Sequence, residues 1–599
     1  MKAIVKSFAF SWKLVWEACG ASVLLYLLID VLQSLIPLLD LYFLNALLEN
    51  ITAKDHDGIV LSAALIILTT ASGIFLSGLQ GIISDHVREK SDESFHELIL
   101  NKVSEMPFEI LDTSEGRDKM DYASCCSNIV CNEIPFGVFY ILRNIYTFVI
   151  AAIVLIQYNI IFFILFLLLT IPGILLDYVF NKKTDELSRK TAPDIRKMNY
   201  YRWMLVDAWP AKDVRMYDLT DSMKERYHTE KSKFYKKTRQ LDNKRTGASV
   251  AAEMIRRAGE LIFVLFVILD ALRGDLTVGD VVLFCGYAVI VSETFSSIMN
   301  RFIGYVKLDS ETVMPKFFEF MEYPSLEESS GTRNLTKFES LSFENVWFRY
   351  PASNDYVLKG ASFTLYAGDK MSIIGINGAG KSTIIKLMLG LYQINSGKIL
   401  INGHPMNEYD LHDIRKMFSV LFQNFVQYPL TLRENVALSD LEKIPYDAEI
   451  ESVLRQSGVY DDLEPKLQNG LNSYMTRQFH DKGTELSKGQ WQKIALARAY
   501  FKNAQITVFD EPSAALDAQA EDQIFSDFEK IAEGKTAIMI SHRISSARSS
   551  NKIIVLDGGM IVETGSHDEL VAKNGLYAKL YTLQKKKYTM EEENENEAV

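Results

Sequence analysis

Residues 373–383 read Ile-Ile-Gly-Ile-Asn-Gly-Ala-Gly-Lys-Ser-Thr, a glycine-rich stretch between an apolar run and an amphipathic run. The β-branched residues at its start are typical of a buried strand, and residues 384–391 have the apolar spacing of a helix. The pattern Gly-x4-Gly-Lys-Ser between a strand and a helix is that of a P-loop. This stretch therefore predicts an α/β nucleotide-binding domain in the second half of the chain.

Phosphate chemistry explains the residue types of this loop. Glycines let the backbone fold tightly and point its N–H groups at a triphosphate, and the helix N-terminus adds partial positive charge. Lys381 can reach the β- and γ-phosphates, and the Ser382 hydroxyl can bind Mg²⁺. The nucleotide-binding residues expected in the loop are Gly375, Asn377, Gly378, Ala379, Gly380, Lys381, Ser382 and Thr383.

The composition indicates a chain that is half membrane-embedded and half soluble. Its 599 residues are 48% hydrophobic, and the mean hydropathy of +0.03 lies between the values of soluble and fully embedded proteins. The formal net charge of −12 argues against nucleic acid as a partner. Five cysteines, an odd number without metal-type spacing, indicate free thiols in a reducing cytosol. Incidental thiols are favoured over a metal or redox site at Cys125, Cys126 and Cys131.

Six long apolar segments in the first half predict a membrane α-helical bundle. Each can supply the ~20 residues that cross ~30 Å of hydrocarbon, and six of them disfavour the alternative of buried helices in a soluble protein. Residues 1–13 lack the cleavage pattern of a signal peptide and predict an amphipathic segment at the membrane surface. The six segments are 18–46, 58–83, 134–157, 159–180, 248–272 and 277–305.

Positive charges predict the orientation of these segments. The connection 181–247 is rich in Lys and Arg, whereas the connections 47–57 and 273–276 contain one such residue each. By the positive-inside rule, the long connections 84–133 and 181–247 and both termini face the cytoplasm. We expect each long connection to extend two adjacent membrane helices and to carry a short helix at its tip. The candidate tips are 115–122 and 211–217.

Polar side chains form stripes along three of the predicted spans. Ionisable groups facing lipid are costly, so these stripes should face the bundle interior or a watery cavity. Hydrogen bonding between helices, without a substrate role, is the alternative. The mixture of polar and aromatic groups favours a peptide or a drug-like compound over a plain lipid as substrate. The candidate cavity residues are Tyr26, Asp30, Gln33 and Asp40 in the first span, Tyr140 and Arg143 in the third, and Glu293, Ser297 and Asn300 in the sixth.

The character of the chain changes near residue 320. A polar linker is expected at 321–338, and alternating strands predict an α/β domain over 339–585. The charged tail 586–599 is typical of disorder. The fold class predicted from these features is a membrane domain of six transmembrane helices over 1–320, followed by an α/β P-loop ATPase domain.

Further motifs accompany the P-loop in a fixed order. They comprise an aromatic residue before the loop, a glutamine after a short strand, a signature segment, a strand ending in two carboxylates, a D-loop and a histidine. These motifs are Tyr350, Gln423, Leu486–Gln490, Ile506–Glu511, Ser513–Asp517 and His542. In this order they resemble the ATP-binding cassette (ABC) transporters. The signature has Lys488 where the family has a glycine; this adds a cation near the γ-phosphate, and we expect it to be tolerated.

The resemblance implies a role for each motif, with ATP and Mg²⁺ as cofactors. Tyr350 would lie against the adenine ring, and Mg²⁺ would be held by Ser382, Gln423 and Asp510. Glu511 would act as general base for the attacking water. The catalytic set is thus expected to be Glu511, His542, Gln423 and Lys381. The signature residues expected to complete the nucleotide site of a second subunit are Ser487, Lys488, Gly489 and Gln490, and Asp517 of the D-loop is a further expected nucleotide-binding residue.

The family architecture implies a half-transporter. One membrane half and one cassette without an internal repeat require a second half-transporter, either an identical copy or a homologous subunit. The arrangement resembles the exporter branch, which implies ATP-driven export across the cytoplasmic membrane, with membrane lipid and the transported substrate as further partners. A helical insert between Gln423 and Leu486 is expected to receive the tip helices. An ATP-gated channel or regulatory sensor, or an importer, are the alternatives; the retained Glu511 and His542 favour a pump over a channel.

Overall fold

The computed structural model describes residues 2–308, 314–324, 331–351, 353–511, 534–541 and 547–585. The chain forms two compact units. The first comprises Met1–Ser104 and Asp118–Glu322, and the second comprises Glu105–Arg117 and Tyr323–Val599. The second unit therefore takes in a short piece of the first long connection, which the sequence had placed with the membrane domain.

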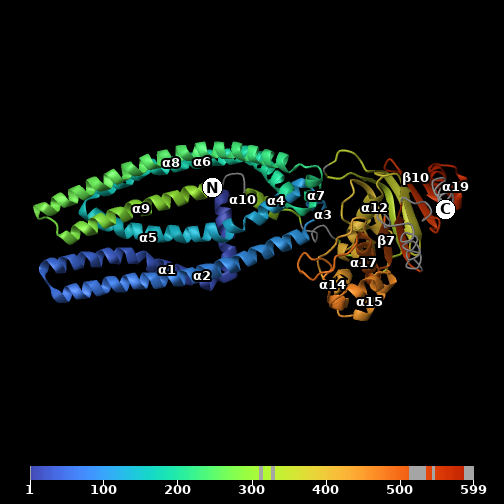
Figure 1. Ribbon diagram of the computed structural model, residues 1–599, viewed down its shortest axis with the longest axis horizontal. Coiled ribbons are helices and arrows are strands. Elements are labelled where there is room, and N and C mark those ends of the chain that lie inside the picture. Colours follow the sequence, from blue (N-terminus) through green and yellow to red (C-terminus); the bar gives the residue numbers. More distant parts are fainter. Residues whose placement is uncertain are drawn as a thin grey trace. The chain divides into compact units, whose positions relative to one another are not determined.

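Long helices make up the first unit. α1 and α2 lie side by side, and so do α6 and α8 (Figure 1). The elements are α1 (Lys2–Ala53), α2 (His56–Glu105), α4 (Ser114–Cys125), the π-helical turn η1 (Asn128–Glu133), α5 (Ile134–Tyr158), α6 (Ile160–Val206), α7 (Ala208–Met216), α8 (Thr220–Arg273), α9 (Val278–Leu308) and α10 (Met314–Met321).

The first helix is broken near its start. Cys19 has non-helical torsion angles (φ −157°, ψ 43°), so the residues before it form a separate helical arm. The Ser11 hydroxyl of this arm donates to the Val130 carbonyl at 2.5 Å. The ring of Phe10 lies 5.1 Å from that of Phe317 in α10. These contacts hold the arm against η1 and α10.

Five helices are long and apolar enough to cross a membrane. They are Val5–Ala53, His56–Glu105, Ser114–Tyr158, Ile160–Ser188 and Val278–Tyr305. The remaining predicted segment, 248–272, lies within α8 and is not among the five found in the described residues, since charged side chains interrupt it. These charges are paired: Arg256 Nη1 donates to Glu260 Oε1 and to Ser292 Oγ of α9, both at 2.9 Å.

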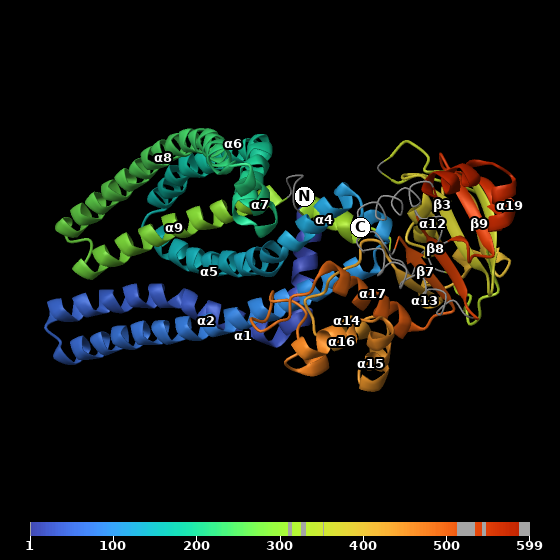
Figure 2. The same ribbon diagram turned by 45° about the vertical axis from the view of Figure 1, so that its right-hand side comes forward.

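The second unit contains two sheets. An antiparallel sheet has the strand order β2-β1-β4-β5, and a mixed sheet has the order β10-β9-β3-β8-β7-β6, in which only β10 runs antiparallel to its neighbour. Strands β9, β3, β8 and β7 of the mixed sheet are labelled in Figure 2. The strands are β1 (Ser340–Phe348), β2 (Leu358–Tyr366), β3 (Lys370–Gly375), β4 (Ser396–Ile401), β5 (His404–Pro405), β6 (Phe418–Leu421), β7 (Ile506–Asp510), β8 (Thr536–Ile540), β9 (Lys552–Asp557) and β10 (Met560–Gly565).

The middle of the mixed sheet forms the core that positions the candidate site. Strands β3, β7 and β8 are buried along nearly their whole length, as expected for parallel strands covered on both faces. Ile540 of β8 pairs with Ile373 on one side and Asp510 on the other. This register brings the carboxyl ends of β3 and β7 to the same edge, where α/β sheets bind ligands.

Short helices surround these sheets. A group of them, α14 to α17, has its own apolar core, which includes Leu454, Trp491 and Phe501. The helices are α3 (Phe108–Leu111), α12 (Lys381–Met388), α13 (Leu411–Lys416), α14 (Leu432–Ala437), α15 (Asp447–Gln456), α16 (Tyr460–Leu463), α17 (Lys488–Lys502) and α19 (His567–Ala572), with single turns η2 (Met406–Glu408), η3 (Leu441–Lys443), η4 (Glu464–Lys466) and η5 (Gly470–Asn472).

The short helix between α2 and α4 lies earlier in the chain than the sequence predicted. α2 ends at Glu105, and Pro107, in an extended conformation (φ −57°, ψ 135°), precedes the one-turn helix α3. The predicted tip at 115–122 instead lies within α4. The second predicted tip, 211–217, overlaps α7.

Candidate functional site

The P-loop joins β3 to α12 at the carboxyl edge of the mixed sheet. Gly380 caps α12 with φ of 102°, a left-handed conformation that favours glycine. A Cβ at Gly375 would collide with the carbonyl oxygen of Leu556 in the neighbouring strand β9. The turn geometry and the strand packing therefore each explain one glycine of the motif.

Lys381 is a buried cation at the base of this loop. Its Nζ donates to the carbonyls of Gly375 at 2.9 Å and Ile376 at 3.3 Å, and lies 3.8 Å from Glu511 Oε1. Burial lowers the pKa of Lys381, while the nearby carboxylates of Glu511 and Asp510 act in the opposite direction. The ammonium group is thus held where the loop would receive a phosphate.

Asp510 ends β7 beside the first turn of α12. The Ser382 hydroxyl donates to Asp510 Oδ1 at 3.1 Å. Burial raises the pKa of the Asp510 carboxyl, and the hydrogen bond from Ser382 partly offsets this effect. A buried carboxylate next to a hydroxyl provides the hard oxygen donors that Mg²⁺ prefers, so these residues fit the predicted ion.

Glu511 has a left-handed backbone conformation, with φ of 48°. Such a conformation costs a non-glycine residue about 1–2 kcal/mol, and residues of this kind cluster at functional sites. Its N–H donates to the Ile540 carbonyl at 3.0 Å, which fixes the backbone against β8. Its side chain accepts a 2.5 Å hydrogen bond from Gln423 Nε2. The structure therefore brings Gln423, Lys381 and Glu511 together from three separate elements.

Tyr350 is tied to the helix that follows the P-loop. Its hydroxyl and that of Thr383 are 3.0 Å apart and hydrogen-bonded. Its ring packs edge-on against Tyr392 at 5.2 Å between centroids, and Lys386 Nζ lies 5.2 Å from the Tyr350 centroid. The aromatic residue predicted to contact adenine is thus fixed at the start of α12.

The signature segment forms the beginning of α17. Ser487 Oγ accepts from the Gln490 N–H at 3.2 Å, and Gln490 Oε1 accepts from the Ser487 N–H at 3.0 Å, a capping box. Lys488 and Gly489 form the first turn of this helix. These hydrogen bonds are internal to the segment and do not connect it to the P-loop of its own chain. Asp517 and His542 lie outside the described residues.

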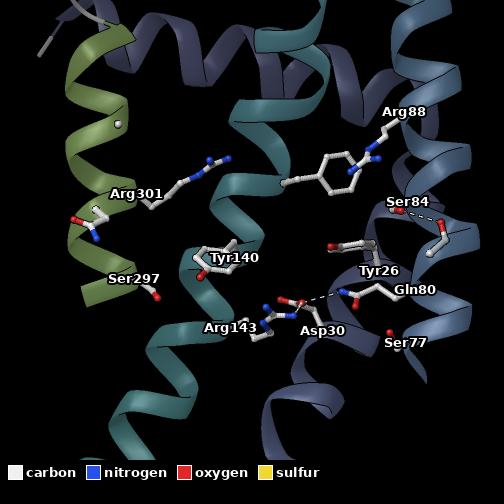
Figure 3. A pocket seen from close by; sticks show the side chains of 14 residues that line it. Tyr26, Asp30, Ser77, Gln80, Ser84, Arg88, Tyr140, Arg143, Ser297 and Arg301 are labelled. Atoms are coloured by element: carbon white, nitrogen blue, oxygen red, sulfur yellow. Dashed lines mark hydrogen bonds and ion pairs between the residues drawn. The ribbon is translucent and has the colours of Figure 1, made fainter. Parts of the chain in front are cut away.

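Two cavities in the first unit contain most of the residues predicted to line a substrate cavity. A cavity of about 800 Å³ is lined by Tyr26, Asp30, Tyr140, Arg143, Ser297 and Asn300, among others (Figure 3). A second, of about 440 Å³, is lined by Gln33, Arg143 and Glu293 among others. Asp40 is not among the lining residues of either; its carboxylate accepts a short hydrogen bond from Thr69 of α2.

Sequence reasoning missed the contribution of α2 to the larger cavity. Its lining includes a row of polar side chains on this helix, and Gln80 Nε2 donates to Asp30 Oδ1 at 2.9 Å. The row is Ser77, Gln80, Ser84 and Arg88. Steps of three and four residues place these side chains on one helix face, so the same periodicity used for the other spans could have identified them. Arg301 of α9 was also missed; it follows Ser297 by four residues.

Comparison with known proteins identifies the family. The model of the ABC transporter transmembrane region matches residues 21–295, and the ABC transporter model matches residues 358–514. The subtilin transport ATP-binding protein SpaT of Bacillus subtilis is 30% identical over 96% of this chain and 94% of its own length. The chain belongs to the ABC transporter family.

Other relatives of this ABC transporter agree with its fold. The nisin transport ATP-binding protein NisT of Lactococcus lactis is 33% identical over 64% of each chain. An ATP-dependent lipid A-core flippase of Alcanivorax borkumensis is 27% identical over 67% of each chain. A bacterial Atm1-family ABC exporter with ATP bound has a TM-score of 0.75 at 22% identity, covering 95% of this chain and 99% of that chain.

These findings confirm several predictions from the sequence. The protein is an ABC exporter in which a transmembrane helical domain is fused to an ATPase domain, and it couples ATP binding and hydrolysis to export. It is an integral membrane protein, and its half-transporter architecture implies a dimer. The prediction that Cys125, Cys126 and Cys131 are incidental thiols is not tested by these comparisons; in the described residues they form no disulfide.

A short piece of the first connection of this ABC transporter contacts Tyr392 within the second unit. The Tyr392 hydroxyl donates to Asp112 Oδ2 at 2.6 Å, and the Tyr392 ring packs edge-on against Phe108 of α3 at 5.6 Å. Tyr392 precedes β4, so this contact does not involve the helical insert, and the expectation that the insert receives the tip helices stays a prediction. Tyr392 provides both an aromatic ring and a hydroxyl donor, which explains why α3 and Asp112 contact this residue. Tyr392 also touches Tyr350, which links α3 to the nucleotide site.

We expect Tyr392→Phe to weaken this link. The substitution keeps the ring but removes the hydrogen bond to Asp112, a loss of roughly 1–2 kcal/mol, or about five- to thirtyfold, in the free energy of the contact. Stimulation of ATPase activity by substrate should fall severalfold, measured as phosphate release from reconstituted protein. Tyr366→Phe, at an exposed position on β2, is the matched control. Equal stimulation in both variants would show that the hydroxyl does not contribute to coupling.

Proposed function

We propose that this ABC transporter exports an amphipathic peptide or a drug-like compound across the cytoplasmic membrane. The observation that carries the proposal is the cavity of about 800 Å³, whose lining combines aromatic, neutral polar and charged side chains from α1, α2, α5 and α9. Such a surface can bind both faces of an amphipathic molecule. Relatives named for transport of subtilin and nisin support a peptide, whereas relatives named as lipid A-core flippases make lipid the competing substrate.

The proposed working form is a dimer of two half-transporters, identical or homologous. In such a dimer the signature segment of one copy, with Asp517, completes the nucleotide site of the other. The position of the signature segment at the start of the fifteen-residue helix α17 supports this role, because a helix N-terminus carries partial positive charge that favours phosphate. Two ATP molecules would then lie between the two ATPase domains, and their binding would favour the closed state.

The geometry at the end of β7 supports a division of roles for hydrolysis. We propose that Ser382, Asp510 and Gln423 hold Mg²⁺, which when bound neutralises charge on the phosphates. Glu511 accepts the proton of the attacking water, with its side chain positioned by Gln423. Lys381 stabilises the negative charge that develops on the phosphate oxygens, and His542 contacts the γ-phosphate.

The positive-inside pattern supports a cytoplasmic location for the ATPase domain and both termini. Under this orientation, ATP is bound on the side of the membrane where it is produced, and substrate leaves on the opposite side. Inverted vesicles, in which the ATPase domain faces outward, test the direction: a labelled amphipathic peptide should accumulate inside them only with ATP and Mg²⁺. Uptake by right-side-out vesicles instead would identify an importer.

We expect Asp30→Ala and Glu293→Ala to change the ratio of peptide-stimulated to basal ATPase activity. Asp30 lines the larger cavity and Glu293 lines the smaller one, and both belong to the first unit. The measurement is phosphate release against peptide concentration. Glu97→Ala, an exposed position on α2 outside both linings, should leave the ratio unchanged. If the cavity variants match this control with every peptide tried, these residues do not bind substrate.

A further inference from the structure

The larger cavity of the first unit is electropositive. Of the described residues that line it, three are arginines, from α2, α5 and α9, and only one, Asp30, is a carboxylate (Figure 3). The three arginines are Arg88, Arg143 and Arg301. The balance of formal charge in the lining is therefore positive, in a part of the chain where charged groups are costly unless they are paired.

Asp30 is already engaged and cannot neutralise all three cations. Its Oδ1 accepts the 2.9 Å hydrogen bond from Gln80 and lies 3.8 Å from Arg143 Nη1. Asp30 is almost fully buried, whereas Arg143 is only half-buried. One carboxylate thus pairs with one arginine, and the described lining contains no second carboxylate for Arg88 or Arg301.

Arg88 has a weak and solvent-exposed partner. Its Nη1 lies 3.8 Å from Asp85 Oδ1, one turn away on the same helix, and both side chains are more than half exposed. Exposed pairs of this kind contribute little stability. The guanidinium group also lies over the ring of Phe136, 5.0 Å from its centroid. A ring takes up none of the charge of the guanidinium, whose N–H groups can still bind an oxyanion.

Arg301 has a guanidinium N–H donor that lacks an acceptor among the described residues. Its Nη2 donates to the backbone carbonyl of Glu133 at 2.8 Å, a neutral acceptor, and its guanidinium lies over the Tyr305 ring at 5.4 Å. In the described part of the chain its Nε is buried and has no hydrogen-bond partner. A guanidinium whose hydrogen-bond partner is a neutral carbonyl keeps its full positive charge, and Arg301 lines the cavity, so a ligand that brings a carboxylate to this group gains affinity.

We infer that this cavity selects peptides that bear carboxylates, either acidic side chains or a C-terminal carboxylate, which pair with Arg88 and Arg301. The inference rests on the proposed export function and narrows its substrate class. Guanidinium groups bind carboxylates through paired N–H donors. The neutral polar groups in the same lining suit the amides of a peptide better than the acyl chains of a lipid. These groups are Ser77, Gln80, Ser84, Ser297 and Asn300.

The test compares three synthetic amphipathic peptides of one sequence, with Glu, Gln or Lys at the same polar positions. The full-length protein is reconstituted in phosphatidylcholine vesicles, and the half-saturating peptide concentration for ATPase stimulation is measured. We expect the Glu peptide to act at a concentration about tenfold lower than the Gln peptide, the effect of one charge-assisted hydrogen bond. The Lys peptide should act least.

Variants of two arginines test whether these residues cause the preference for the Glu peptide. Arg301→Gln and Arg88→Gln should each remove most of the preference for Glu over Gln, and Arg301→Lys should retain part of it. The exposed position of Arg88 protects the test against misfolding. Arg196→Gln, at an exposed site on α6 outside the lining, should leave the preference and the basal ATPase activity as in the parent.

Different results would contradict the preference for carboxylates and the proposed export of peptides on which it rests. Equal half-saturating concentrations for the Glu and Lys peptides, with active ATPase, would overturn the inference and leave peptide export standing. Stimulation by phosphatidylglycerol vesicles without peptide, lost in Arg301→Gln, would overturn it in favour of an anionic lipid. If no peptide stimulates ATPase activity or is transported, the proposed peptide function fails and the inference falls with it.

Discussion

Glu511→Gln is expected to lower the rate of ATP hydrolysis by about 10²- to 10⁴-fold, the usual contribution of a general base. The amide cannot accept a proton from water, but it keeps the shape of the side chain beside Gln423. ATP binding should therefore persist, and the variant should hold bound ATP. Phosphate release measures turnover, and equilibrium binding of a labelled ATP measures affinity.

The matched control for this variant is Glu339→Gln, at an exposed position before β1. It should hydrolyse ATP at the parental rate. Parental hydrolysis by Glu511→Gln would refute the assignment of Glu511 as the base. Loss of binding together with hydrolysis would indicate instead that Glu511 supports the P-loop through its contact with Lys381.

Lys381→Met is expected to lower kcat/KM for ATP by about 10²- to 10³-fold, because it removes a buried cation aimed at the phosphates. Methionine retains most of the side-chain volume, so the loop should keep its packing. Loss of the hydrogen bonds to Gly375 and Ile376 should also make the loop less ordered. Steady-state ATPase kinetics measure the effect, and Lys398→Met on the exposed side of β4 is the control. An unchanged kcat/KM would exclude Lys381 from the site.

The nucleotide site could be predicted from the sequence because its signals are local. The strand, glycine loop and helix at 373–391 are contiguous, and Asp510 and Glu511 follow an apolar run that could only be a buried strand. What the sequence did not contain is the register that places β3 and β7 on either side of β8. The family resemblance implied that Ser382, Gln423 and Asp510 bind one ion, but it did not predict this register.

The contacts of the first connection could not be predicted in the same way. Its one-turn helix depends on Pro107 and on an aromatic contact between Phe108 and Tyr392, residues separated by most of the chain. No local pattern encodes such a contact. The predicted tip, 115–122, lies in α4 and is not the short helix that contacts Tyr392.

The larger cavity shows what the periodicity of polar residues along a helix can predict and what it cannot. Polar stripes on three spans gave residues that line it, and the same argument applied to α2 would have added Arg88. Periodicity does not reveal how charges from different helices balance when they meet. That balance, with Asp30 as the one carboxylate among the described lining residues, emerges only when α1, α2, α5 and α9 are packed together.

The most direct test of the account is ATP-driven movement of a labelled amphipathic peptide into inverted vesicles that contain the purified protein. We predict accumulation above the outside concentration in the presence of ATP and Mg²⁺, and none with Glu511→Gln under the same conditions. Accumulation without ATP, or accumulation that Glu511→Gln leaves unchanged, would contradict the claim that hydrolysis at this site drives export.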